Sequence, residues 1–392
     1  MERPKLRNVE RIPLQRGGES LLVLRDPLGL SPPLALDAAF APLLDGLDGR
    51  KSVAQLRQSL AMIHGLRVDA EDLDEVLAEL ADAGLLDDDR FRERWAEAHE
   101  AFLAADSRAP VLADVLYPAE PAALRELLTQ CVPRREPVPG QLRALLLPHA
   151  PLELAGATVA AGLAALPPAA SLDAIVLLGA DHHPGLLPFA ATDRPYRTPL
   201  GTTTVAQPLL AALQRRLPWI DREAIRHRSA HSLEWAVLYL QHAWGDAMPP
   251  MVPLLCGPTA IAASGTLDAA VGELVATLEA LLEDARVLVV AAAELSHLGP
   301  AYGREAIDDD ARAQLHARDR SLLDALCRGR TRELLARGDD LLGQGRPSGL
   351  PVLATLAELA TGGHGEILDH RLAPLPAPAR GHVGLAAVRL SP

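Results

Sequence analysis

Three apolar segments of the sequence end in residues that can bind a metal ion or transfer a proton. The segment LLGADHHP contains His182 and His183, ALLLPHA contains His149, and VLVVAAAELSH contains Glu294 and His297. Ligands of open α/β sheets bind beyond the carboxyl ends of the strands, so these side chains are expected to meet. Imidazole is the commonest ligand for zinc, iron and copper, and two histidines with one carboxylate suit non-haem Fe(II). The pattern favours a metal or acid/base pocket over three unrelated structural histidines.

A fourth segment, SAHSLEW, places His231 and Glu234 three residues apart on one face of an expected helix start. The remaining histidines have no comparable setting. Five lie in charged surroundings and are interpreted as solvated surface residues, and three lie near the C-terminal strands without a partner motif: His64, His99, His227, His242 and His316, then His364, His370 and His382. Cys256 follows an apolar strand and is interpreted as a buried, inert thiol.

Several common catalytic motifs are absent from the sequence. Neither GxGxxG nor GxxxxGK[ST] occurs, so nothing supports nucleotide dependence. The GxSxG nucleophile elbow is also missing, which lowers the expectation of a hydrolase. Ser296 and His297 do not form a nucleophile and base by adjacency, because neighbouring strand residues point to opposite faces.

The elements that must position these residues are short apolar strands alternating with amphipathic helices. The expected strands span 144–147, 174–178, 252–255 and 287–292, and the segments GEILDHRLAP and GHVGLAAVRL are expected to add more. Nearly unbroken apolar runs suit central strands covered on both faces. Residues 108–392 are therefore predicted to form one three-layer α/β/α sandwich.

The first part of the chain is predicted to be a separate, mainly helical module. Residues 1–92 combine a short hairpin at 21–27 with three helices, and Ser52 and Asp69 are placed to cap the second and third. The arrangement is typical of a small winged-helix-like domain. Residues 93–107 are expected to be a helical connector.

Composition limits the classes of function. The 392 residues suit two domains, and the formal charge of −13 argues against a nucleic-acid partner. The three cysteines form no CxxC, so neither a disulfide framework nor a zinc ribbon is expected. Without a signal peptide or an apolar run of about 18 residues, a cytoplasmic protein with no membrane association is predicted.

Six ordered motifs over residues 108–390 resemble the MEMO family, known as protein B of the AmmeMemoRadiSam system. They are RAPVLADVLYPAEPAAL, LLLPHAPLELAG, LLGADHHP, YRTPLG, AHSLEWAVLYLQ and AAAELSHLG. The resemblance implies a fold similar to class III extradiol dioxygenases, in which non-haem iron sits on two histidines and a carboxylate.

Carried over to this chain, the resemblance implies an Fe or Cu ion bound by His149 and His182. His297 and His231 would line the pocket as acid/base or substrate-contact groups, with His183 as a supporting neighbour. The family's usual third ligand is a cysteine, and Gln344 of LLGQGRPSG stands in its place. An amide oxygen is a weaker ligand than a thiolate, so either Glu294 completes the site or metal binding has been lost. Asp181 is expected to orient a ring nitrogen.

The N-terminal module resembles the PqqD-like winged helix that binds leader peptides, which implies a peptide or protein partner. Three hypotheses follow. The first is a metal-dependent, dioxygenase-like oxidoreductase acting on a peptide, protein or small aromatic substrate. The second is a non-catalytic binding or adaptor protein that partners a radical-SAM or peptide-modifying system. The third is a hydrolase in which His297 activates a metal-bound water.

Overall fold

A computed structural model of the chain describes residues 3–16, 18–182, 185–284, 286–302, 308–339, 347–377 and 379–392. It divides into two compact units, Met1–Ala104 and Ala105–Pro392. His183 and Gln344, both singled out by the sequence, lie outside the described residues. No helix in the described ranges is both long enough and apolar enough to cross a membrane.

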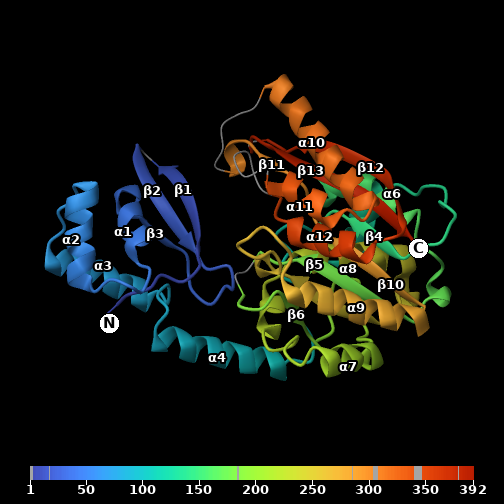
Figure 1. The fold of residues 1–392 in the computed structure, drawn as a ribbon, viewed down its shortest axis with the longest axis horizontal. Helices are drawn as coiled ribbons and strands as arrows, with labels where there is room; N and C mark the ends of the chain where they lie inside the picture. Colours follow the sequence, from blue (N-terminus) through green and yellow to red (C-terminus); the bar gives the residue numbers. More distant parts are fainter. Residues whose placement is uncertain are drawn as a thin grey trace. The chain divides into compact units, whose positions relative to one another are not determined.

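The described residues of the first unit form a three-stranded antiparallel sheet and four α-helices (Figure 1). Its elements are β1 (Glu10–Arg16), β2 (Glu19–Arg25), β3 (Leu34–Asp37), α1 (Ala41–Gly46), α2 (Val53–His64), α3 (Ala70–Asp82) and α4 (Asp89–Ala104). The predicted connector at 93–107 falls mostly within α4, and the division between the units follows that helix.

Two local predictions for this unit need correction. Residues 21–27 do not form a hairpin, because 19–25 is one continuous strand and the reversal lies at Gly18, whose φ of 89° suits glycine. Asp69 occupies the residue before α3, but its side chain makes no capping hydrogen bond. Ser52 does cap α2, since its hydroxyl accepts from the Gln55 amide and the Gln55 side chain accepts from the Ser52 amide.

The second unit is built on an eight-stranded mixed sheet. Its order is β11-β13-β4-β10-β5-β9-β6, with β12 paired to β13. The strands are β4 (Ala144–Leu147), β5 (Ala174–Ala180), β6 (Phe189–Ala191), β9 (Met251–Cys256), β10 (Val287–Ala292), β11 (His297–Leu298), β12 (His364–Pro374) and β13 (His382–Ser391); β7 (Arg197–Thr198) and β8 (Gly201–Thr202) form a separate pair. The expected strands are thus all present, with ends shifted by a few residues.

Helices cover both faces of this sheet (Figure 1). Alternate strand residues enter two cores, so Leu146 and Val176 pack with one set of helices while Leu145 and Ile175 pack with the other. The first set is α7 (Gln207–Arg216), α9 (Ala269–Asp284), α10 (Asp309–Cys327), α11 (Thr331–Asp339) and α12 (Leu350–Leu359). The second is α5 (Pro121–Cys131), α6 (Leu152–Leu163) and α8 (Ser232–Trp244). The chain is therefore α/β, as predicted.

Strand order explains why the polar strand ends converge. Strands β4, β10 and β5 are adjacent and parallel, and Ala292 of β10 pairs with Leu147 on one side and Gly179 on the other. Two residues beyond this common register, each strand presents a polar side chain: His149, Glu294 and Asp181 respectively. The register therefore places His149 and Glu294 at one edge of the sheet, and His182 follows Asp181 directly.

Gly179 allows α8 to approach β5 closely. A Cβ at this position would lie 2.6 Å from Leu233 Cδ2 and 2.7 Å from Ser232 Oγ. We expect Gly179→Ala to destabilise the second unit by about 1–3 kcal/mol through overpacking, measured by urea unfolding. Gly272→Ala on α9 is the control, because its added Cβ meets nothing within 4 Å and is expected to stabilise slightly. Equal midpoints for Gly179→Ala and the wild type would contradict the packing argument.

Candidate metal centre

Three imidazoles from separate parts of the second unit meet at the carboxyl edge of the sheet. His149 follows β4, His182 follows β5, and His231 immediately precedes α8. One ring nitrogen from each lies within 4.8 Å of the other two. The rings of His182 and His231 are stacked with centroids 4.6 Å apart and an interplanar angle of 7°.

The closest pair of ring nitrogens has a spacing that suits a shared metal ion. His149 Nε2 and His182 Nε2 lie 3.2 Å apart. Two nitrogens each about 2.1 Å from one ion stand roughly 3.0–3.4 Å apart at angles between square and tetrahedral. Without an ion, the same contact is a hydrogen bond in which one neutral ring donates. The three histidines therefore fit a borderline transition metal, for which imidazole is a preferred ligand.

Both histidines of this pair favour the neutral form that a metal ion requires. Burial lowers the pKa of His149, and this effect exceeds the opposing influence of Glu294. Burial also lowers the pKa of His182 well below its usual value, with further lowering by His149 and His231. Their lone pairs are therefore available at neutral pH.

Glu294 lies beside the imidazoles but bonds most closely to His297. Its Oε2 lies 2.7 Å from His297 Nε2 and 3.7 Å from His149 Nε2. Burial opposes ionisation of Glu294, but the neighbouring His149 and the hydrogen bond from His297 lower its pKa to about 2. Burial also disfavours the His297 cation, yet the hydrogen bond and charge of Glu294 raise the pKa of His297 overall. Each residue therefore favours the charged form of the other.

The effect of this pair on stability has a defined pH window. The lowered pKa of Glu294 contributes stability above its ordinary value of 4.5, and this is lost as the pH falls toward about 2. The raised pKa of His297 contributes stability below its ordinary value of 6.5, and this is lost as the pH rises through the folded-state pKa. The pair therefore stabilises the fold most between about pH 4.5 and 6.5.

We expect Glu294→Gln to lower the pKa of His297, because an amide keeps the volume and removes the charge that favours imidazolium. An NMR titration of the histidine rings in metal-free protein measures this directly. Asp173→Asn, which removes an exposed carboxylate paired with Arg286, should leave the His297 titration unchanged. An unaltered pKa of His297 in Glu294→Gln would show that the pair does not hold the proton.

The structure thus brings together all five site residues that the sequence predicted: His149, His182, His231, Glu294 and His297. It groups His231 with the predicted ligands, whereas the sequence assigned it an acid/base role. Tyr302 was not predicted as a site residue. Its ring packs edge-on against that of His297, and the two ring centroids lie 4.8 Å apart. A single tyrosine in the GPAYG segment carries no motif, so the sequence offered no signal for it.

Several neighbouring predictions have different outcomes. Asp181 bonds the guanidinium of Arg226 through Oδ2, and its expected role in orienting a ring nitrogen stays a prediction. His227 is wholly buried, so its interpretation as a solvated residue is wrong. The charged sequence Arg226-His227-Arg228 concealed this burial. Cys256 is buried, and burial raises the pKa of its thiol to about 12, in keeping with an inert role.

Two other side chains near the site are held by internal hydrogen bonds. Ser296 is buried and its hydroxyl donates to Asp319 Oδ1 at 2.6 Å. Glu234 is also buried and bonds Arg108, so it does not join the imidazoles as the His231–Glu234 spacing suggested.

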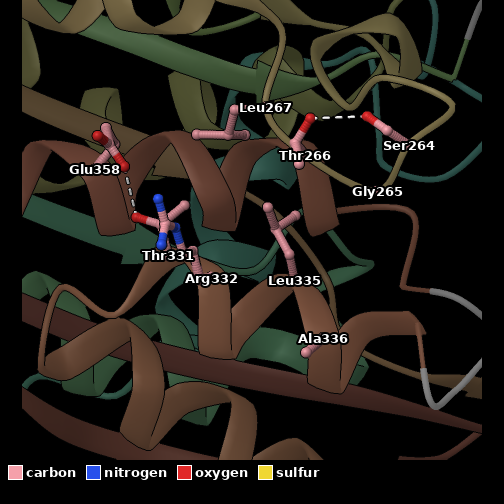
Figure 2. Close-up of a pocket in the computed structure, with 9 residues that line it drawn as sticks. All are labelled: Ser264, Gly265, Thr266, Leu267, Thr331, Arg332, Leu335, Ala336 and Glu358. Carbon is pink, nitrogen blue, oxygen red and sulfur yellow. Dashed lines mark hydrogen bonds between the residues drawn. The ribbon is translucent and has the colours of Figure 1, made fainter.

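A separate cavity of about 480 Å³ lies between the loop before α9 and the helices α11 and α12 (Figure 2). The Thr331 hydroxyl donates to Glu358 at 2.7 Å, and the hydroxyls of Ser264 and Thr266 lie 2.8 Å apart. The nine lining residues drawn include neither histidine nor cysteine. Imidazole groups that could bind a metal ion are therefore found in the cluster of His149, His182 and His231 and not among these residues.

Comparison with known proteins identifies the family. A family model described as "Memo-like protein" matches residues 108–386. The chain belongs to this family, as its six motifs predicted.

Curated relatives agree with this assignment. A MEMO1 family protein of Thermus thermophilus is 29% identical over 350 residues, covering 88% of this chain and all of that protein. One from Aquifex aeolicus is 25% identical and covers 77% of each chain. The Thermus match is longer than the second unit, so it extends into the first. An uncharacterised protein of Escherichia coli K12 resembles the structure at 17% identity and a TM-score of 0.40, covering 64% of this chain and all of that one.

Proposed function

We propose that the chain is a metal-dependent oxidoreductase that holds iron or copper on His149, His182 and His231. The observation that carries this proposal is the convergence of three imidazole nitrogens within 4.8 Å, two of them 3.2 Å apart on rings whose lowered pKa favours the neutral form. Three protein ligands leave coordination positions open for substrate. A bound iron or copper ion would supply one-electron and oxygen chemistry.

His231 is proposed as the third ligand in place of Glu294. The Glu294 carboxylate is engaged by His297 at 2.7 Å, whereas His231 offers a ring nitrogen within the same cluster as His149 and His182. The ligand set would then be three neutral imidazoles with one carboxylate 3.7 Å from His149. Glu294 would orient His297 and balance part of the charge of the ion.

His297 is proposed as the proton donor and acceptor of the reaction. Its side chain is 19% exposed, compared with 1% for His149, so it has more access to substrate and water. Glu294 favours its protonated form, which suits donation of a proton to a developing anion. After donation, the neutral ring would regain a proton from solvent.

The substrate is proposed to be a peptide, a protein or a small aromatic molecule. The first unit would recognise a peptide or protein partner, in line with its resemblance to PqqD-like modules. Similarity to class III extradiol dioxygenases makes an aromatic ring the small-molecule candidate.

A non-catalytic binding or adaptor protein is the second candidate, acting with a radical-SAM or peptide-modifying system. Gln344 favours it, because an amide stands where the family's cysteine ligand is expected. Hydrolysis by a metal-activated water, with His297 as base, ranks third.

Metal analysis and oxygen uptake separate these candidates. Protein purified without chelators is expected to hold about one iron or copper ion per chain. Loaded protein should consume oxygen when it is supplied with a substrate and a reductant. Absence of bound metal after anaerobic loading with Fe(II) or Cu(I) would reject the oxidoreductase. Tight metal binding with a captured radical-SAM partner and no oxygen uptake would favour the adaptor.

A further inference from the structure

A buried ion pair supports the segment of backbone that carries His231. Arg108 is 1% exposed and Glu234 is fully buried, and one terminal nitrogen of the guanidinium bonds a carboxylate oxygen. The two residues are 126 positions apart in sequence, and Arg108 is the first residue matched by the family model. Neither residue lies among the imidazoles, so the pair acts on the site only through the backbone.

The guanidinium also bonds two main-chain carbonyls just before His231. Its Nε donates to the His227 carbonyl at 3.0 Å, and its second terminal nitrogen donates to the Ala230 carbonyl. Ala230 directly precedes His231, and Glu234 follows it by one turn of α8. Arg108 therefore fixes the chain on both sides of His231.

The carboxylate of Glu234 is itself fully held in place. It accepts hydrogen bonds from the backbone amides of Val111 and Leu112, each at 2.9 Å, and from the Tyr117 hydroxyl. Arg108 is anchored in turn, because its amide donates to the Pro195 carbonyl and its carbonyl accepts from the Arg197 amide. Both charges are thus attached to rigid backbone and cannot shift independently.

His227 extends the same support toward the sheet. Its Nε2 donates to the Ala190 carbonyl of β6 at 2.8 Å, and its Nδ1 accepts from the Tyr196 hydroxyl at 2.7 Å. Burial lowers the pKa of His227 to about 3, so the ring remains neutral and both nitrogens stay engaged. The backbone from 227 to 234 is consequently held at its start by β6 and along its length by Arg108.

A buried ion pair is a poor way to gain stability, because desolvation offsets much of the attraction between the charges. A hydrophobic pair of similar volume could fill the same space, but it could not bond the carbonyls of His227 and Ala230. The contacts therefore point to a geometric role. We propose that Arg108 is a positioning residue that sets the place of the His231 imidazole relative to His149 and His182. This inference rests on the proposed metal-binding function.

Co(II) binding to the full chain tests the proposal, because the visible absorption bands of bound Co(II) report its coordination geometry. Arg108→Lys keeps the charge but cannot bond the carboxylate and both carbonyls together. We expect it to bind Co(II) about 10–100-fold more weakly than the wild type, with altered visible bands. Leu278→Ala is the control, because it removes buried volume from the opposite core, on α9, and should lower only the thermal midpoint.

A double variant covers the case in which Arg108→Lys fails to fold. Arg108→Met with Glu234→Gln removes both buried charges together, while the single carbonyl oxygen of the glutamine can still accept from the amide of Leu112. It is expected to fold, as judged by circular dichroism, and to show the same loss of Co(II) affinity. A folded Arg108 variant with wild-type affinity and unchanged bands would overturn the proposal.

Ring NMR of metal-free protein separates failure of this proposal from failure of the proposed function. The His231 resonances, assigned with His231→Gln, should shift in Arg108→Lys and stay constant in Leu278→Ala. If the wild type binds no Co(II), the metal-binding function fails, and the His231 resonances still decide the positioning role. Unchanged His231 resonances in Arg108→Lys would overturn that role whatever the metal result.

Discussion

Replacing His149 with alanine is expected to reduce metal binding from about one ion per chain to an undetectable level. His149 is the innermost of the three imidazoles, and its Nε2 lies close to both His182 and Glu294. Its loss would leave two histidines, too few to hold iron or copper against a chelator. Inductively coupled plasma mass spectrometry after anaerobic loading and desalting measures the result.

The control for this experiment is His364→Ala, which removes an exposed histidine from β12 in the same unit. It should retain the wild-type metal content. The secondary structure of His149→Ala should be unchanged by circular dichroism, so that lost binding is not confused with unfolding. Equal metal content in His149→Ala and the wild type would place the ion elsewhere.

The sequence predicted the cluster of polar side chains well where strand ends defined it. His149, His182, Glu294 and His297 each follow a nearly unbroken apolar strand, and adjacent parallel strands bring such positions to one edge. Strand order itself could not be derived, because a continuous apolar run carries no information about which neighbour it pairs with. The sheet order β4-β10-β5 was needed to see that the three ends are neighbours.

Residues that act through buried hydrogen bonds were harder to predict. Arg108 and His227 lie in charged, turn-rich sequence, where solvent exposure is the ordinary expectation. Their burial depends on contacts with Glu234 and Tyr196, which are distant in sequence. His231 was found from the sequence, but its grouping with His149 depends on how α8 packs against Gly179. Long-range packing of this kind leaves no local pattern.

The first unit has a buried ion pair of its own, between Arg7 and Asp26. Arg7 and Asp26 are 6% and 0% exposed, and two guanidinium nitrogens bond the carboxylate. Asp26 also accepts from the amides of Leu28 and Leu30, and Arg7 donates to the carbonyl of Gly84 after α3. The pair therefore joins three segments that are far apart in the sequence.

Asp26→Ala is expected to destabilise the first unit by about 3–5 kcal/mol, because it leaves Arg7 buried without its counter-charge. This is a large share of the roughly 5–15 kcal/mol that stabilises a typical domain. Hydrogen exchange of the full chain should show faster exchange in peptides from 1–104 and wild-type protection in peptides from 105–392.

Asp45→Ala is the control, because it breaks an exposed pair with Arg11 and should cost at most about 1 kcal/mol. Metal content should stay at the wild-type level in both variants, since all three proposed ligands lie in the second unit. Loss of protection across both units in Asp26→Ala would mean that the units unfold together.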